Sequence, residues 1–204
     1  MTIHLHQGDL PDDVTFSGAV AVDSETLGLN PLRDRLCVVQ LSAGDGEAHL
    51  VQLAAGQYEA PNLKKVLADQ SLVKIFHFAR FDVAAFHHWL GVKTTPIYCT
   101  KIASKLARTY TDRHGLKDVV RELVGVELSK QQQSSDWAAA ELSEAQKTYA
   151  ASDVLYLHKA KDRLDEMLER EGRTQLAQEC FAFLSTRAEL DLKGWSETDI
   201  FAHS

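Results

Sequence analysis

The stretch from Ala19 to Leu29 constrains the fold of this chain more than any other. A short run of alanine and valine leads directly into two acidic residues, Asp23 and Glu25. The apolar run is too short for an exposed helix and predicts a buried strand. Alternate residues of a strand point to the same face, so the two carboxylates should project side by side. They either end the strand as a polar turn or surround a cation, because paired buried acids otherwise repel each other.

Length and composition bound what the rest of the chain can be. With 204 residues and 45% hydrophobic side chains, the chain can bury one sizeable core, which predicts a single domain over residues 1–204. No apolar stretch approaches the ~18 residues of a membrane span, and the first residues lack the basic and apolar parts of a signal peptide. Three widely spaced cysteines without a CxxC pattern indicate reduced thiols. We therefore expect a cytoplasmic protein with no membrane partner.

The charge of the chain is unevenly distributed. A net charge of −7 argues against a protein that grips long nucleic acid by its backbone. Residues 101–130 nevertheless hold seven basic against four acidic side chains. This local excess is explained equally well by a solvated helix face and by a surface that binds phosphate.

Hydrophobic periodicity predicts a mixed α/β domain. After the strand that begins at Ala19, two further strands over 36–42 and 47–53 follow across short turns, which predicts an antiparallel meander. The pattern then alternates between helix and strand, which indicates parallel βαβ units. The expected elements are a helix from 61, a strand over 73–77, a helix over 81–90, a strand over 97–99, and helices near 100–108, 115–124, 143–171 and 173–191.

Two more acidic residues stand where a carboxylate is unusual. Asp82 falls near the first turn of the helix that follows the strand 73–77, where the helix dipole alone would favour an acid. Asp153 lies among small and apolar neighbours, where a lone carboxylate would be costly to bury. Tyr149 precedes it by one helical turn and should share its face.

Four carboxylates in one pocket would repel one another unless cations compensate their charge. Two divalent ions would do so, and oxygen ligands without a histidine or cysteine cluster favour Mg²⁺ or Mn²⁺ over Zn²⁺. Two such ions ~4 Å apart are typical of phosphodiester hydrolysis. A phenol such as Tyr149 could hold the attacking water by a hydrogen bond.

The ordered set Asp23-x-Glu25, Asp82 and Tyr149-x-x-x-Asp153 resembles the three motifs of the DEDD 3′–5′ exonucleases. The position of the tyrosine is similar to the DEDDy branch, and the chain as a whole resembles ribonuclease D catalytic domains. The resemblance implies a ribonuclease H-like fold, with Asp23, Glu25 and Asp153 around one metal and Asp23 with Asp82 around the other. It names Glu25 and Tyr149 as catalytic. One departure is Phe78, where this family often carries asparagine after the histidine that corresponds to His77.

The resemblance also implies which residues meet the substrate. Thr26, together with Glu25, would contact the terminal 3′-OH, and Gly28 would let the backbone approach the sugar. Leu29 matches a leucine that wedges between the last two bases, although a leucine is also a common core residue. His77 fits the ribonuclease D pattern, and a strand-end residue packed in the core is the alternative.

The chain resembles most closely the short, single-domain relatives called nanoRNase C, because it ends at Ser204 without the helical RNA-binding domains of ribonuclease D. Members of that group act on very short oligoribonucleotides and form homo-oligomers, so a homo-oligomer is expected, with an octamer as one candidate. The polar stretch before the last motif supplies Lys130, Gln133 and Trp137 as candidate substrate contacts. A capped loop with a buried tryptophan is an equally good interpretation.

We therefore expect a metal-dependent 3′–5′ exoribonuclease that releases 5′-mononucleotides from short single-stranded RNA. The same active site working on single- or double-stranded DNA ends is the nearest alternative, since no residue reads the 2′-OH recognisably. An inert nucleic-acid-binding module is a third class, and the presence of all four acids and Tyr149 argues against it.

Overall fold

The computed structural model describes residues 1–129, 131–132 and 134–203. Within this part of the chain, the centre of the molecule is a six-stranded sheet with the order β1-β4-β3-β2-β5-β6. The strand β2 pairs antiparallel with β3 and parallel with β5, and the pairs β1–β4 and β5–β6 are also parallel. The strands are β1 (Thr2–Gln7), β2 (Ala19–Thr26), β3 (Leu36–Ser42), β4 (Glu47–Gln52), β5 (Val73–Phe76) and β6 (Ile97–Cys99).

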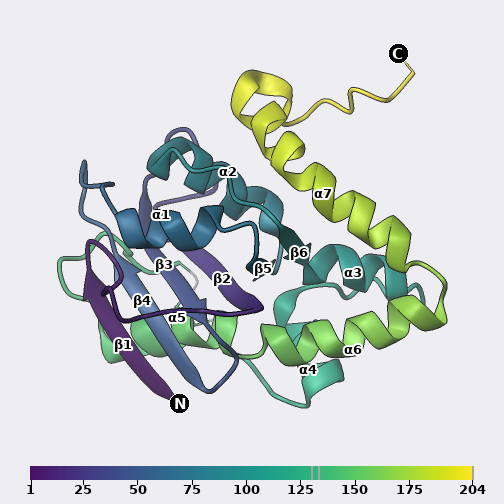
Figure 1. Cartoon of the computed structure of the whole chain (residues 1–204), viewed down its shortest axis with the longest axis horizontal. Coiled ribbons are helices and arrows are strands. Elements are labelled where there is room, and N and C mark those ends of the chain that lie inside the picture. Colours follow the sequence, from purple (N-terminus) through teal and green to yellow (C-terminus); the bar gives the residue numbers. More distant parts are fainter. Residues whose placement is uncertain (130, 133, 204) are drawn as a thin grey trace.

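Helices cover both faces of this sheet (Figure 1). In Figure 1, α1 and α2 lie over one face and α5 lies over the opposite face, while α7 packs on α2 and leads toward the C-terminus. The helices are α1 (Pro61–Ala68), α2 (Ala79–Leu90), α3 (Thr100–Ala107), α4 (Leu116–Val124), α5 (Glu144–Leu155), α6 (Leu157–Arg170) and α7 (Thr174–Leu190), followed by the π-helical turn η1 (Asp191–Trp195). No helix among the described residues is long and apolar enough to cross a membrane.

The predicted mixed sheet is confirmed, including the antiparallel meander of β2, β3 and β4. Strand β1, which pairs with β4 at the edge of the sheet, was not predicted from the sequence. Its residues alternate between apolar and polar types, a pattern that suits an edge strand with one covered face. Six residues at a chain start give a weak signal, because the partner that makes them a strand lies 45 positions later in the sequence.

The single helix expected over residues 143–171 is two helices. Tyr156, with φ −108° and ψ −1°, is both the last flanking residue of α5 and the first flanking residue of α6. Helix α5 packs on β2, β3 and β4, whereas α6 packs against α3 and α4. The hydrophobic pattern continues across the break, because each helix buries its own apolar stripe against a different partner.

Two buried clusters follow from the alternation of side chains in β2 and β3. Val22 and its cross-strand partner Leu41 belong to the larger cluster, which extends under α1 and α2. A smaller cluster on the α5 face contains Val38, Leu50 and Trp137. Asp23 and Glu25 point to this second face, because they alternate with Val22 along the strand. The fold therefore presents the two acids to α5.

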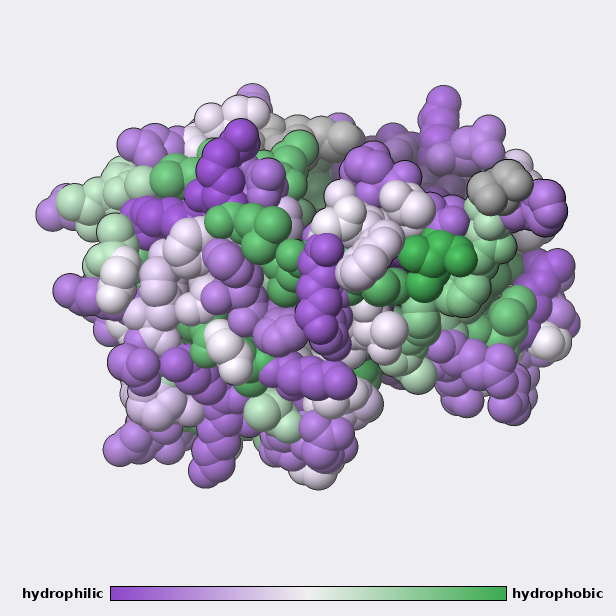
Figure 2. All heavy atoms as spheres, turned by 90° about the horizontal axis from the view of Figure 1, so that it is seen from above, coloured by the Kyte–Doolittle hydropathy of each residue, from purple (hydrophilic) through white to green (hydrophobic). Residues whose placement is uncertain are grey.

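The surface fits the composition of the chain. Figure 2 shows that hydrophilic side chains cover most of the face seen from above, with hydrophobic side chains gathered in patches between them. Several large apolar side chains are exposed near the C-terminus, including Trp195 at 44% and Phe201 at 76%.

Candidate active site

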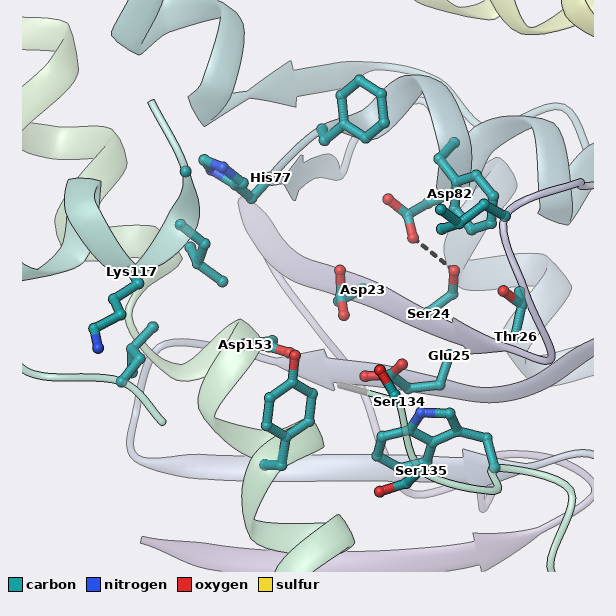
Figure 3. Close-up of a pocket in the computed structure, with 18 of the residues that line it drawn as sticks. Asp23, Ser24, Glu25, Thr26, His77, Asp82, Lys117, Ser134, Ser135 and Asp153 are labelled. Carbon is teal, nitrogen blue, oxygen red and sulfur yellow. Dashed lines mark hydrogen bonds between the residues drawn. The ribbon is translucent and has the colours of Figure 1, made fainter. Parts of the chain in front are cut away.

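A pocket of about 650 Å³ opens beside the carboxyl end of β2. Strand β2 contributes its acids from one side, and α5 contributes Asp153 from another (Figure 3). Tyr149, which also lies on α5, lines the same pocket. The segment after β5 supplies His77, and α2 supplies Asp82. All five residues of the predicted exonuclease motifs therefore line one pocket, although they come from three different elements, β2, α2 and α5.

Three carboxylates form the centre of the pocket. Ligand oxygens of Asp23, Glu25 and Asp153 all lie within 4.8 Å of one another. Asp23 and Glu25 share a face of β2, and α5 places Asp153 opposite them (Figure 3). The two elements are packed directly against each other, so the separation is set by the core beneath them.

Asp82 reaches the same pocket from the α2 side. Its Oδ1 accepts a hydrogen bond of 2.6 Å from the Ser24 hydroxyl, and both side chains are buried. Ser24 alternates with Asp23 and Glu25, so its side chain points away from α5 and toward α2 (Figure 3). Ser24 thus links strand β2 to the fourth acid, a contact that was not predicted from the sequence.

Burial and mutual repulsion make the four carboxyl groups reluctant to ionise. Burial raises the pKa of Asp82 and of Asp153 to about 7 and that of Glu25 to about 9. The pKa of Asp23 lies well above its ordinary value, because burial and the neighbouring charges of Asp82, Asp153 and Glu25 all disfavour its ionised form. Buried carboxylates are hard oxygen ligands, which fit Mg²⁺ or Mn²⁺. Binding of such an ion would compensate the negative charges of the four groups and remove their repulsion.

Tyr149 lies one helical turn before Asp153 on α5. Burial first, and then the nearby charges of Asp153, Glu25 and Asp23, raise the pKa of its phenol. The phenol of Tyr149 therefore keeps its proton and can donate a hydrogen bond. Its ring centroid lies 6.0 Å from that of Trp137, which limits how the phenol can move.

The start of α5 is fixed by a capping box. The Ser143 hydroxyl accepts from the backbone N–H of Gln146, and the Gln146 side chain accepts from the backbone N–H of Ser143. This reciprocal pair satisfies two backbone donors that a helix N-terminus otherwise leaves unpaired. The Gln146 amide also donates to the Asp136 carbonyl, 3.0 Å away, which ties α5 to the preceding loop.

The departure at Phe78 falls on an unusual backbone position. Phe78 immediately precedes α2 and adopts a left-handed conformation with φ 70°. Asparagine tolerates this conformation far better than phenylalanine does. The Phe78 ring is 45% exposed, and the ammonium of Lys101 lies 4.3 Å from its centroid. The strained position therefore presents an aromatic face at the edge of the pocket.

Thr26, Gly28 and Leu29 form the turn at the end of β2, beside the pocket. The Thr26 hydroxyl donates to the Gly28 carbonyl at 2.5 Å, which closes the turn. A Cβ on Gly28 would collide with the Asp34 carboxylate, which accepts a hydrogen bond from the Asn30 N–H, so glycine suits this position. Leu29 is 89% exposed and is therefore not a core leucine. Thr26, Gly28 and Leu29 all line the pocket, and their contacts with substrate stay a prediction.

His77 lies half-buried between β5 and α2. Its Nδ1 is 2.9 Å from the Thr100 hydroxyl, and its buried Nε2 has no hydrogen-bond partner among the described residues. Burial, together with the charge of Lys101, lowers the pKa of His77 to about 3. The imidazole is therefore neutral and available for a hydrogen bond in the pocket.

The loop before α5 was expected to contain Lys130, Gln133 and Trp137 as substrate contacts. Lys130 and Gln133 lie outside the described residues. Trp137 lines the pocket but is only 2% exposed and packs in the smaller core cluster, so most of its contacts are with the protein. The neighbouring side chains of Ser134 and Ser135, which sequence analysis did not single out, also line the pocket.

Two lysines of the pocket were also missed as individual residues. Lys101 lies in the first turn of α3 and Lys117 in the first turn of α4, and both line the pocket. Figure 3 places Lys117 across the pocket from Thr26. The only signal in the sequence was the excess of basic side chains over residues 101–130, which a solvated helix face explained as well.

The chain is similar to known nucleases in sequence. A family model described as a 3′-5′ exonuclease matches residues 9–169. The ribonuclease D of Gluconacetobacter diazotrophicus is 36% identical over 169 residues, which is 83% of this chain and 42% of that protein. The chain thus spans less than half the length of this curated relative.

Solved structures give a closer match. Brucella melitensis NrnC with bound Mg²⁺ is 61% identical, with a TM-score of 0.95. The same protein bound to pGG is 62% identical, with a TM-score of 0.96. In both cases the match covers 100% of this chain and 100% of the other.

Proposed function

We propose that this chain, which belongs to the 3′–5′ exonuclease family and is similar to ribonuclease D, degrades short oligoribonucleotides. The enzyme would remove 5′-mononucleotides from the 3′ end, and dinucleotides would be among its substrates. The family membership confirms the resemblance drawn from the five motif residues. The mixed sheet with its helices confirms the predicted exonuclease fold.

One observation carries this proposal above the others. Leu29 stands 89% exposed on the segment that directly follows Asp23 and Glu25, in a pocket of about 650 Å³. An exposed leucine at the rim of a carboxylate site is suited to contact a base next to the bond that is cut. A relative that is 62% identical over the whole chain has been solved with pGG, which supports a short substrate for this chain as well.

The acids would hold two divalent ions, Mg²⁺ or Mn²⁺. Asp23, Glu25 and Asp153 would bind one ion, and Asp23 with Asp82 would bind the other. When bound, such ions supply an activated water and stabilise the charge on the leaving oxygen. The close approach of three carboxylates and the raised pKa of Glu25, about 9, support a site that depends on cations.

The protein's own side chains would orient the reacting groups. The Tyr149 hydroxyl would hold the attacking water in line with the bond between phosphorus and the 3′-oxygen. That bond breaks as the water oxygen binds phosphorus, which leaves a 5′-mononucleotide and a shortened chain with a free 3′-OH. Glu25 and Thr26 would bind the terminal 3′-OH, and Gly28 would leave room for the sugar.

Several further pocket residues have chemistry that suits the phosphate and base. Lys101 and Lys117 would neutralise phosphate oxygens, and the neutral His77 would form a hydrogen bond with the substrate through its free Nε2. We further propose that the protein is a homo-oligomer, with an octamer as one candidate. The exposed apolar side chains near the C-terminus, Trp195 and Phe201 among them, support a subunit contact. Light scattering of purified protein measures the subunit number.

The proposal is tested by kcat/KM for RNAs of two, five and twenty nucleotides and for single- and double-stranded DNA. Each reaction is run with Mg²⁺, with Mn²⁺ and with EDTA. We expect the dinucleotide to be cleaved at least as efficiently as longer RNA, and Leu29→Ala to lower its kcat/KM most. Leu176→Ala, an exposed leucine on α7 that does not line the pocket, is the control.

Two outcomes would contradict the proposal. A strong preference for the twenty-nucleotide RNA would show that the enzyme follows long nucleic acid. More efficient cleavage of DNA than of RNA would replace an exoribonuclease with a DNA exonuclease that uses the same site.

A further inference from the structure

A cluster of three histidines and one glutamate lies on strands β1 and β4, outside the active site. Its members are His4, His6, Glu47 and His49. The His4 Nε2 lies 3.2 Å from a Glu47 carboxylate oxygen, and the His6 Nε2 lies 3.0 Å from the His49 Nδ1. Ligand atoms of His4, Glu47 and His49 all lie within 4.8 Å of one another.

The register of the two strands brings these side chains together. In the parallel pair, His4 lies opposite His49, and Thr2 lies opposite Glu47. His4 and His6 are two positions apart on β1, as Glu47 and His49 are on β4, so all four side chains share one face of the sheet. The cluster is therefore built from backbone pairing and not from a mobile loop.

This face is opposite to the one that carries the active-site acids. His49 pairs with Leu41 on β3, and Leu41 pairs with Val22 on β2. Residues directly opposite each other in neighbouring strands share a face, so His49 is on the side of Val22. Asp23, the next residue after Val22, points the other way. Strand β3 also separates the two strands of the cluster from β2 in the sheet.

The arrangement of the rings suits a cation. The imidazoles of His4 and His49 are stacked with centroids 4.9 Å apart, and those of His6 and His49 with centroids 5.3 Å apart. A neutral imidazole binds a metal ion through a nitrogen lone pair, and the cluster offers three imidazoles. Glu47 adds a negative charge to the group.

The cluster also has an access route and an outer hydrogen bond. The His4 side chain is 39% exposed and that of Glu47 is 49% exposed, so an ion can enter from solvent and keep a water ligand. Histidines that bind a metal usually donate their other N–H to a hydrogen-bond partner. His6 is such a partner for His49.

We propose that His4, His49 and Glu47 form a binding site for one divalent transition-metal ion of the zinc class, which clamps β1 to β4. Nitrogen ligands favour Zn²⁺ over Mg²⁺. Neighbouring ligand atoms around a tetrahedral zinc ion with bonds of ~2.0–2.1 Å lie roughly 3.3 Å apart, close to the 3.2 Å between His4 and Glu47. Strand β1 has β4 as its neighbour in the sheet on one side only, and the ion adds a second link between the two strands.

The test is calorimetric titration of the whole, untagged protein with Zn²⁺ in excess Mg²⁺. The variants are His4→Ala, His49→Ala and Glu47→Gln, and the control is His88→Ala, an exposed histidine on α2. All are also made with Asp23→Asn, which weakens zinc binding by the active-site acids. We expect the parent and the His88→Ala variant each to bind one equivalent of Zn²⁺ per chain. The three cluster variants should lack this equivalent.

Amide hydrogen exchange supplies a second readout that does not depend on activity. Zn²⁺ should slow exchange across residues 2–7 in the parent and in His88→Ala, and should leave it unchanged in Glu47→Gln, whose exposed position spares the fold. Equal zinc stoichiometry in the parent and in Glu47→Gln would overturn the proposal. Unaltered exchange of β1 in the zinc-loaded parent would overturn the clamp.

Discussion

Asp153 shows at the scale of one residue how the four acids oppose folding in the absence of metal. Burial raises its pKa to about 7, whereas an unfolded aspartate titrates near ~3.9. The folded state then binds more protons than the unfolded state between these values, so the stability of the metal-free protein falls as pH rises from about 4 to about 7. Asp82, with a pKa of about 7, acts in the same direction.

Asp153→Asn should therefore abolish turnover and leave the metal-free protein as stable as the parent or more stable. The amide removes a charged ligand and relieves the repulsion in the cluster. The free energy of unfolding, measured with urea in EDTA, should fall less between pH 5 and pH 8 for Asp153→Asn than for the parent. Mg²⁺ should restore the stability of the parent at pH 8. A fully active Asp153→Asn enzyme would refute the assignment of Asp153 as a metal ligand.

Tyr149 tests whether the site uses an oriented water. Tyr149→Phe removes the hydroxyl and keeps the ring that packs near Trp137. We expect kcat to fall by ~10²–10⁴, the range for one positioned acid–base or orienting group, while KM changes little. Steady-state kinetics on a dinucleotide measure both values. An unchanged kcat at saturating substrate would mean that Tyr149 only packs against its neighbours.

At the scale of an element, the capping box of α5 should determine how firmly this helix is held. Ser143→Ala removes the side-chain acceptor for the Gln146 N–H and should lower the free energy of unfolding by about 1 kcal/mol. Ser143→Asp, which keeps an acceptor at the cap, is the control and should lose less. Urea denaturation of both variants measures the difference. Equal losses in the two variants would show that the cap does not stabilise α5.

At the scale of the whole molecule, the net charge of −7 leaves few places where a long phosphate backbone could be held. Lys101 and Lys117 are the lysines that line the described pocket. Each single-strand phosphate contact lowers log K by ~0.7 for each unit of log salt concentration. For a dinucleotide, we expect a slope of log K against log salt concentration that corresponds to one to two phosphate contacts. The slope for a twenty-nucleotide RNA should be little steeper. Binding of both RNAs to Asp153→Asn across a salt series measures the slopes, and a steep slope for the longer RNA would contradict this expectation.

The sequence by itself determined the elements and the chemistry of the main site. Strand alternation and helical spacing are local properties, so β2 through β6 and most helices could be predicted within a few residues. The five acid and tyrosine positions were recognisable because their order and spacing form a set. The exposure of Leu29 and the burial of Trp137 could not be predicted, because each residue type suited two environments equally well.

Only the tertiary structure decided which distant residues meet. Strand pairing placed His4 opposite His49, and the position of α2 beside the sheet brought Asp82 to the Ser24 hydroxyl. The break at Tyr156 and the lysines of the pocket likewise depend on how helices pack against the sheet. Local patterns report which face of an element is buried. They carry no information about the neighbour across that face, because that neighbour is selected by the free energy of packing the whole chain.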